Sequence, residues 1–217
     1  MIEELPGMSC IYQEKEVFMK ILGIVCSPRK NGNTQILIEE ALDAAREKGA
    51  ETEMVLVADK QISPCDACDG CLEDGVCVIE DDMQEIYQKL EDADGIIFGT
   101  PVYFINVSAQ AKAVIDRTYA FLWTRKLRGK VAAAAVATRR IGAGQVLSLL
   151  YSWFTAQRMI NVGGCIGYGR DKGEVKEGVG GGPGSTALGE ARAVGKAMVG
   201  MVNRLSKAMT ANDGWIE

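Results

Sequence analysis

The sequence predicts an α/β fold in which five parallel strands form a doubly wound sheet with helices on both faces. Two observations carry this prediction. Short apolar runs alternate with amphipathic segments of helical period along the 217 residues, and such alternation indicates repeated strand–helix–strand units. The runs are apolar throughout, which is typical of parallel strands that are buried on both faces. The length suits one domain, and no internal repeat is visible.

The elements follow one another in a regular order. Apolar residues recur at helical spacing after the first strand, and Gly49 is a suitable stop for that helix. Acidic residues open the second helix, where they suit the positive end of the helix dipole, and Ser108 is a suitable N-cap for the third. The predicted strands are residues 19–27, 51–57, 95–103, 130–138 and 158–169, and the predicted helices are residues 34–49, 81–93, 108–122, 144–157 and 185–209.

The two ends of the chain differ from this pattern. Residues 1–18 are predicted to form an N-terminal arm, and residues 19–217 to form the domain itself. The glycine-rich segment 177–185 is interpreted as a mobile loop, because it lacks the Lys-Ser/Thr end of a P-loop. No run approaches the roughly 20 apolar residues of a membrane span, and the acidic start has no signal-peptide core. We therefore expect a cytoplasmic protein with no membrane partner.

Composition excludes several functions. A net charge of −5 argues against nucleic-acid binding, and the absence of histidine excludes Ser-His-Asp and Cys-His catalysis. Seven cysteines are an odd number, and cytoplasmic thiols stay reduced, so a set of disulfides is not expected. Cys26 and Cys165 lie in or beside apolar strands and are interpreted as small buried hydrophobes.

The loop after the first strand, CSPRKNGNT, is a candidate phosphate site. It lies at the carboxyl end of a parallel strand and leads into a helix N-terminus, where free N–H groups attract an anion. Its hydroxyl and amide side chains can donate hydrogen bonds, its arginine can pair with phosphate, and its glycine permits a left-handed bend. Such turns also occur without a ligand. The candidate residues are Ser27, Arg29, Asn31, Gly32, Asn33 and Thr34.

Four cysteines, Cys65, Cys68, Cys71 and Cys77, have the spacing C-x2-C-x2-C-x5-C. Three closely spaced thiolates can hold one face of an iron–sulfur cubane, and the fourth can close the site from a short loop that contains Gly75. Structural zinc sites usually pair two separate C-x2-C units, whereas here the units overlap. The spacing favours a 4Fe–4S cluster, with zinc and metal-free thiols as alternatives.

Two segments of the chain resemble a known family. SPRKNGNT resembles the FMN-phosphate loop of the flavodoxin-like NAD(P)H-dependent FMN reductases, and GTPVYFINVSAQAKAVIDR resembles their second flavin loop. The similarity runs in order from Met19 to about Leu122 and continues more weakly beyond it. With the cysteines between these loops, the chain is similar to the iron–sulfur flavoproteins. The resemblance implies a flavodoxin-like fold, FMN, and a 4Fe–4S cluster in a loop at residues 60–80.

The resemblance also implies further flavin contacts. The backbone after the third strand would line the flavin ring, and the loop after the fourth strand would be a third ligand loop. Apart from the resemblance, we hypothesise that the cation of Arg139 in this loop stabilises the anionic reduced ring. The Arg139–Arg140 pair departs from the glycine-rich loop of related reductases. A core aromatic pair and a solvated charge pair are the alternative interpretations. The implied residues are Pro101, Val102, Tyr103, Phe104, Asn106, Thr138, Arg139, Gly142 and Gly144.

The function that the resemblance implies is electron transfer between the cluster and FMN, from a ferredoxin-like donor to an acceptor such as a small redox molecule. The cofactors would carry the chemistry, so no catalytic side chain is expected. A homodimer or homotetramer with flavin near the interface is also implied, and the aromatic segments 119–127 and 151–157 suit such an interface or a core. The alternatives are an NAD(P)H-dependent FMN or quinone reductase that uses direct hydride transfer, and a zinc-bound structural or interaction module.

Overall fold

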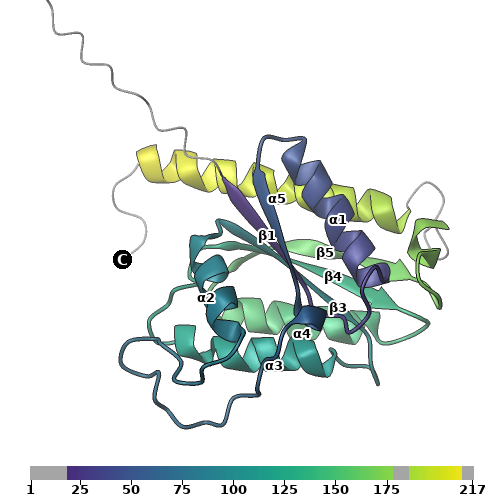
Figure 1. The fold of residues 1–217 in the computed structure, drawn as a ribbon. Helices are drawn as coiled ribbons and strands as arrows, with labels where there is room; N and C mark the ends of the chain where they lie inside the picture. Colours follow the sequence, from purple (N-terminus) through teal and green to yellow (C-terminus); the bar gives the residue numbers. More distant parts are fainter. Residues whose placement is uncertain (1–18, 178–185, 212–217) are drawn as a thin grey trace, which may run out of the picture.

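A computed structural model of the chain describes residues 19–177 and 186–211, so the predicted arm and most of the glycine-rich segment lie outside the described residues. Five strands form one parallel sheet in the order β2-β1-β3-β4-β5 (Figure 1). The strand order reverses between β1 and β3, which is the flavodoxin-like arrangement. The predicted fold class is therefore confirmed. The strands are β1 Lys20–Val25, β2 Glu51–Leu56, β3 Gly95–Pro101, β4 Val131–Thr138 and β5 Ile160–Tyr168.

Helices cover both faces of the sheet. α1 and α5 pack on one face, and α2, α3 and α4 pack on the other (Figure 1). Within the described residues, no helix is both long and apolar enough to cross a membrane. The helices are α1 Asn33–Arg46, α2 Met83–Asp92, α3 Ala109–Arg117, α4 Ala143–Ala156 and α5 Ala187–Ala211, with short 3-10 turns η1 Val57–Asp59, η2 Thr118–Phe121 and η3 Glu174–Glu177.

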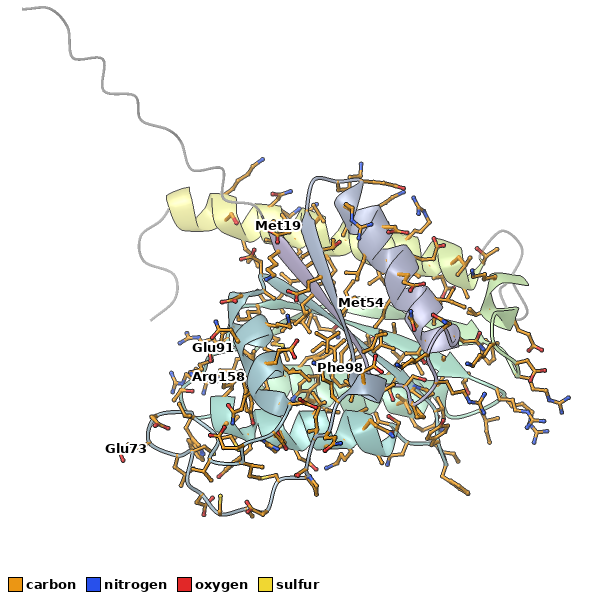
Figure 2. The ribbon with its side chains drawn as sticks, viewed as in Figure 1. Met19, Met54, Glu73, Glu91, Phe98 and Arg158 are labelled. Carbon is orange, nitrogen blue, oxygen red and sulfur yellow. The ribbon has the colours of Figure 1, made fainter. Side chains whose placement is uncertain are left out.

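The core contains most of the aromatic residues that sequence analysis considered for an interface. Phe98 of β3 lies near the centre of the molecule (Figure 2), and its ring lies 4.9 Å from that of Trp153. Phe121 and Phe154 are also buried. Of the aromatic residues in segments 119–127 and 151–157, only Trp123 is largely exposed, at 61%. Core packing therefore explains these segments better than an interface does.

Small residues let the helices approach the sheet and one another closely. All eight residues of β4, VAAAAVAT, are buried. On the α1–α5 face, a Cβ atom at Gly195 of α5 would lie 1.9 Å from the backbone oxygen of Ala41 in α1. The two helices therefore touch at a point where only glycine fits.

Ser108 joins the end of β1 to the start of α3. Its Oγ accepts from the N–H of Ala111 at 3.1 Å, as expected of an N-cap, and donates to the backbone oxygen of Cys26 at 2.6 Å. Its own N–H donates to Thr100 Oγ1 at 3.1 Å. Ser108 therefore joins the two strand ends that meet at the switch in strand order, β1 through its hydroxyl and β3 through its backbone N–H.

We expect Ser108→Ala to destabilise the protein by about 1–2 kcal/mol, because it removes a helix cap and leaves a buried backbone oxygen without its donor. Urea unfolding followed by circular dichroism measures this loss. Ser108→Thr keeps the hydroxyl and is the matched control. A Ser108→Ala midpoint equal to that of the parent protein would contradict the assignment.

Candidate functional site

An open pocket of about 280 Å³ lies at the carboxyl end of the sheet. The loops after β1, β3, β4 and β5 supply its walls, so it lies at the switch point where ligands bind in sheets of this kind. Its size is close to the lower end of the range for ligand pockets, about 300–1,000 Å³. The lining residues are Ser27, Arg29, Gly32, Asn33, Thr34, Pro101, Val102, Tyr103, Ala137, Thr138, Arg139, Gly169, Arg170 and Lys172.

The N-terminus of α1 faces this pocket through Gly32, Asn33 and Thr34. Gly32 is the N-cap, has extended backbone and provides no side chain to cap the helix. The first turn contains no acidic residue. Its backbone N–H groups and the helix dipole are therefore available to an anion, and the loop fits the phosphate of FMN.

Positive charge surrounds the same pocket. Arg29, Arg139, Arg170 and Lys172 line it, and none of the described lining residues is acidic. Sequence analysis identified Arg29 and Arg139 but missed Arg170 and Lys172. The sequence contains a signal for these two residues, because they directly follow the fifth predicted strand, which ends at the carboxyl edge of the sheet.

Asn33 explains why the loop after β5 reaches the pocket. Its side-chain amide donates to the backbone oxygen of Asp171 at 3.0 Å, and its Oδ1 accepts from the N–H of Gly173 at 2.9 Å. The predicted role of this amide was a direct bond to phosphate. In the structure the amide ties the start of α1 to residues 138 or more positions away along the chain, and it uses its oxygen and a single donated hydrogen bond to do so.

Five predicted residues do not line the pocket, and most of them shape its loops. The backbone N–H of Asn31 donates to Gln35 Oε1 at 2.7 Å, in a left-handed conformation. Gly142 is the left-handed N-cap of α4, with φ of 96°. The residues outside the pocket are Asn31, Phe104, Asn106, Gly142 and Gly144.

The loop after β3 forms a tight turn beside the pocket. Tyr103 and Asn106 exchange backbone hydrogen bonds of 2.9 and 3.0 Å. Between them Phe104 and Ile105 have positive φ values of 48° and 62°, which is uncommon for bulky side chains. Phe104 is fully exposed. The turn therefore holds an aromatic ring in solvent next to the wall of the pocket.

The four cysteines of the predicted cluster loop line a second, smaller hollow. Cys71 and Cys77 are buried, Cys65 is half-buried and Cys68 is exposed, and all four are free thiols. Among the residues that the structure describes, no group of three or more acidic or cysteine side chains is arranged to hold a single metal ion. The lining residues are Cys65, Asp66, Ala67, Cys68, Asp69, Cys71, Cys77, Val78, Ile79, Arg117, Tyr119 and Ala120.

The side chains of this hollow are suited to a metal centre with thiolate ligands. Burial raises the pKa of the Cys71 thiol, and the neighbouring Cys77 raises it further. Metal binding reverses this effect, because a coordinated thiol is deprotonated. Four sulfur donors without histidine or a nearby disulfide fit an iron–sulfur cluster.

Glycine is required where the cysteine loop meets η2. Gly75 has φ of 73°, and a Cβ atom there would lie 2.5 Å from Thr124 Oγ1 and 3.0 Å from the backbone oxygen of Ala120. Glu73 lies at the outer edge of this loop (Figure 2). The loop therefore packs closely on η2 at one point and extends into solvent at another.

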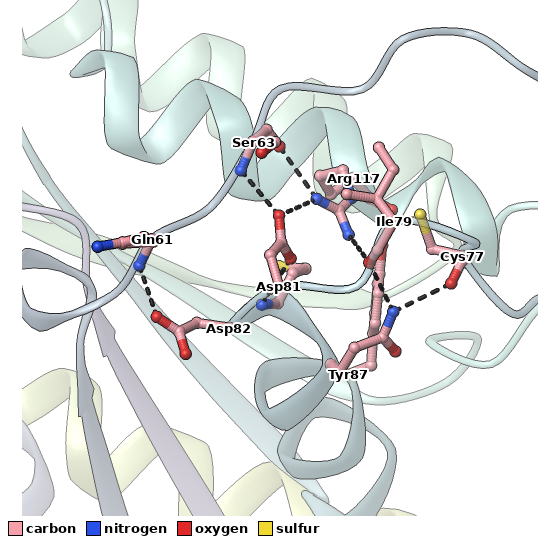
Figure 3. A network of polar contacts seen from close by, with 10 residues as sticks. Gln61, Ser63, Cys77, Ile79, Asp81, Asp82, Tyr87 and Arg117 are labelled. Carbon is pink, nitrogen blue, oxygen red and sulfur yellow. Dashed lines mark hydrogen bonds and ion pairs between the residues drawn. The ribbon is translucent and has the colours of Figure 1, made fainter.

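Arg117, the last residue of α3, holds the two ends of the cysteine loop (Figure 3). Its Nη1 donates to the backbone oxygen of Ser63 at 3.0 Å and to Asp81 Oδ2 at 2.7 Å, and its Nη2 donates to the backbone oxygen of Ile79 at 3.1 Å. Tyr87 donates its hydroxyl to the backbone oxygen of Arg117 at 2.7 Å. This network fixes the loop on both sides of the cysteines.

The charges of this network are compensated. Arg117 is buried, and Asp81 is its ion-pair partner. Burial disfavours the charge on Asp81, but hydrogen bonds from Arg117 and from the N–H groups of Ser63 and Met83 outweigh it and lower the pKa of this carboxyl. The pair is therefore ionised at neutral pH.

The hollow is separate from the pocket at the carboxyl end of the sheet. Because the cysteine segment follows the second strand, the sequence predicts it at that same edge, beside the flavin-type loops. It leaves that edge after η1, but its cysteines lie beside the C-terminal end of α3 and η2. No described residue lines both hollows. Arg117 is the last residue of α3, and its hydrogen bonds hold the cysteine loop at this end of the helix. At 1.5 Å per residue, α3 is about 13 Å long, which separates the loop from the start of the helix.

Comparisons with known proteins bear on the family of the chain. The family described as NADPH-dependent FMN reductase matches residues 19–171. An iron-sulfur flavoprotein of Methanocaldococcus jannaschii is 40% identical over 199 residues, which cover 87% of this chain and 100% of that protein. An iron-sulfur flavoprotein of Methanosarcina thermophila is 43% identical over 150 residues, which cover 67% of this chain and 78% of that protein.

Solved structures agree with the fold. A flavodoxin, WrbA-like protein from Agrobacterium tumefaciens superposes with a TM-score of 0.60 at 16% identity, over 86% of this chain and 98% of that one. The similarity at this level of identity concerns the arrangement of the sheet and helices.

Proposed function

Because the chain belongs to the NADPH-dependent FMN reductase family, and to the iron–sulfur flavoproteins within it, we propose that it transfers electrons between a 4Fe–4S cluster and FMN. The family makes it a flavin-dependent oxidoreductase with FMN as cofactor. The observation that supports the proposal is the presence of two separate sites, a cationic pocket and a hollow lined by four cysteines. When bound, FMN supplies two-electron chemistry and the cluster supplies one-electron chemistry.

The residues of the pocket have distinct tasks in this proposal. The backbone N–H groups at the start of α1 and the side chain of Arg29 bind the phosphate. Pro101, Val102 and Tyr103 lie against the ring, and Arg139 stabilises negative charge on it. Phe104 is held in solvent by its turn, next to the wall of the pocket.

The cysteines have a single task, which is to hold the cluster. Cys65, Cys68, Cys71 and Cys77 are its proposed ligands, because all four line one hollow in one loop. The proposed partners are a ferredoxin-like donor or a small redox acceptor, and a homodimer or homotetramer is the proposed assembly. The exposed aromatic side chains of Phe104 and Trp123 are available to such contacts.

An anaerobic reductive titration tests the proposal. The protein is reconstituted with FMN, iron and sulfide, and visible spectra are recorded while dithionite is added. We expect about one FMN and four irons per chain, with two centres that bleach at different stages. A preparation that binds FMN but retains no iron would contradict the cluster, and one zinc per chain without flavin would contradict the whole proposal.

A second candidate is direct reduction of FMN by NADPH, and the positive charge around the pocket favours it. Arg170 and Lys172 lie beside the predicted phosphate loop, where they can attract a second phosphorylated ligand. Oxidation of NADPH by the protein reconstituted with FMN alone, under anaerobic conditions and with excess free FMN as the electron acceptor, distinguishes the two. Turnover without the cluster would favour this candidate.

A further inference from the structure

We propose that Arg117 is a positioning residue for the cluster, and that its guanidinium both closes the cysteine loop and raises the reduction potential of the cluster. The inference rests on the proposed function, since the charge needs a bound cluster to act on. It assigns to this buried arginine a role that neither the fold nor the flavin pocket requires.

The first part of the inference follows from the hydrogen bonds. Ser63 lies two residues before Cys65, and Ile79 lies two residues after Cys77. Arg117 donates to the backbone oxygens of both, at 3.0 and 3.1 Å. A single planar side chain therefore brings together the two ends of the segment that carries all four cysteines. Lysine, with one nitrogen at the end of a flexible chain, cannot hold three acceptors in this fixed geometry.

The second part follows from the charge. Arg117 lines the hollow with the cysteines and with the carboxylates of Asp66 and Asp69, and among the described lining residues it is the only cation. Its side chain is fully buried, so its field is screened less than that of a surface charge. The potential of an iron–sulfur cluster depends on nearby charge and on hydrogen bonds to its sulfurs. A cation beside the cluster stabilises the more negative, reduced form and therefore raises the potential.

The guanidinium also has one donor to spare. Within the described part of the chain, Arg117 Nε is buried and has no hydrogen-bond partner, although both other nitrogens are used. An unpaired buried donor is costly, and such a group calls for an explanation. A sulfur atom of the cluster, bound in the hollow that the same side chain lines, would be a suitable acceptor for it.

Asp81 supplies the opposite charge and makes a sharp test possible. Its carboxylate pairs with Nη1 at 2.7 Å and offsets part of the field of Arg117. Asp81→Asn keeps the size and an acceptor oxygen but removes the negative charge. Arg117→Met removes the positive charge and all hydrogen-bond donors. Arg117→Lys keeps the charge but loses the planar guanidinium that donates to three acceptors.

The experiment compares iron, sulfide and FMN content with the reduction potential of the cluster, measured by an anaerobic redox titration followed by electron paramagnetic resonance. We expect the potential of Asp81→Asn to shift to more positive values and that of Arg117→Met to more negative values. Arg117→Lys should retain a potential close to the parent value while it loses iron faster to a chelator.

The outcomes separate this inference from the proposed function. Parent protein without iron would overturn the proposed function itself. The inference alone would be overturned if the parent protein, Asp81→Asn and Arg117→Lys all kept their full iron content, had the same reduction potential and lost iron to the chelator at equal rates. If Arg117→Met binds FMN but no iron, the closing role is supported, and the opposite shift in Asp81→Asn then decides the effect on potential.

Discussion

Cys71→Ser should abolish the iron–sulfur cluster and leave FMN in place. Cys71 is buried and lines the hollow with the other three cysteines, and the described lining residues include no fifth cysteine to replace it as a ligand. Serine is slightly smaller than cysteine, so the loop is not overpacked. Because no described residue lines both hollows, the flavin pocket should keep its shape. We expect iron to fall to a small fraction of the parent value, with about one FMN per chain.

Iron and sulfide assays on the purified variant, with the visible spectrum of bound flavin, measure both outcomes. Cys165→Ala is the matched control. Cys165 is also buried but lies in β5 and is not among the residues that line the hollow, and burial raises the pKa of its thiol to about 12. This control should retain the parent iron content. Iron retained in Cys71→Ser, or lost equally in Cys165→Ala, would refute the assignment of the ligands.

Gly195→Ala should destabilise the protein by about 3 kcal/mol, at the upper end of what overpacking usually costs. The new methyl group would lie 1.9 Å from the backbone oxygen of Ala41, and backbone cannot move aside as a flexible side chain can. The helices α1 and α5 must therefore separate. For a chain of this size we expect the melting temperature to fall by roughly 6–12 °C. Thermal unfolding of the apoprotein by circular dichroism measures the change.

Gly200→Ala is the control within the same helix. A Cβ atom at Gly200 would meet nothing within 4 Å, and the residue is exposed. Alanine is the better helix former by about 1 kcal/mol, so this variant should be slightly more stable than the parent. Two Gly→Ala substitutions five residues apart would then change the stability of the protein in opposite directions. A similar effect of both would show that the contact with Ala41 does not determine the stability.

Much of the fold was predictable because its signals are local. Each apolar run became a strand within a few residues, and the N-cap at Ser108 formed as expected. The third helix was predicted too long, since α3 ends at Arg117 and a 3-10 turn follows. The turn is held by Trp153 and Gln157 of the distant α4 region, which donate to Thr118.

The site was predicted less completely, because its missing parts depend on contacts between distant residues. Sequence analysis found the loops after β1, β3 and β4 but not the basic residues after β5, which Asn33 brings to the pocket through Asp171 and Gly173. The role of Arg117 was equally invisible, since Ser63 and Asp81 lie 54 and 36 positions away. Spacing identifies the cysteines as a group, but only the folded chain shows which side chain holds their loop.

The place where the cysteine segment leaves the sheet has an evolutionary consequence. It follows β2, an edge strand whose only neighbour in the described sheet is β1. A segment inserted at this point breaks no strand pairing, and its two ends are joined again by one arginine on a neighbouring helix. A lineage can therefore lengthen, shorten or lose this segment while the rest of the domain keeps folding. Changes confined to this one loop can then convert a cluster-bearing protein into a plain flavin reductase, or a plain flavin reductase into a cluster-bearing protein.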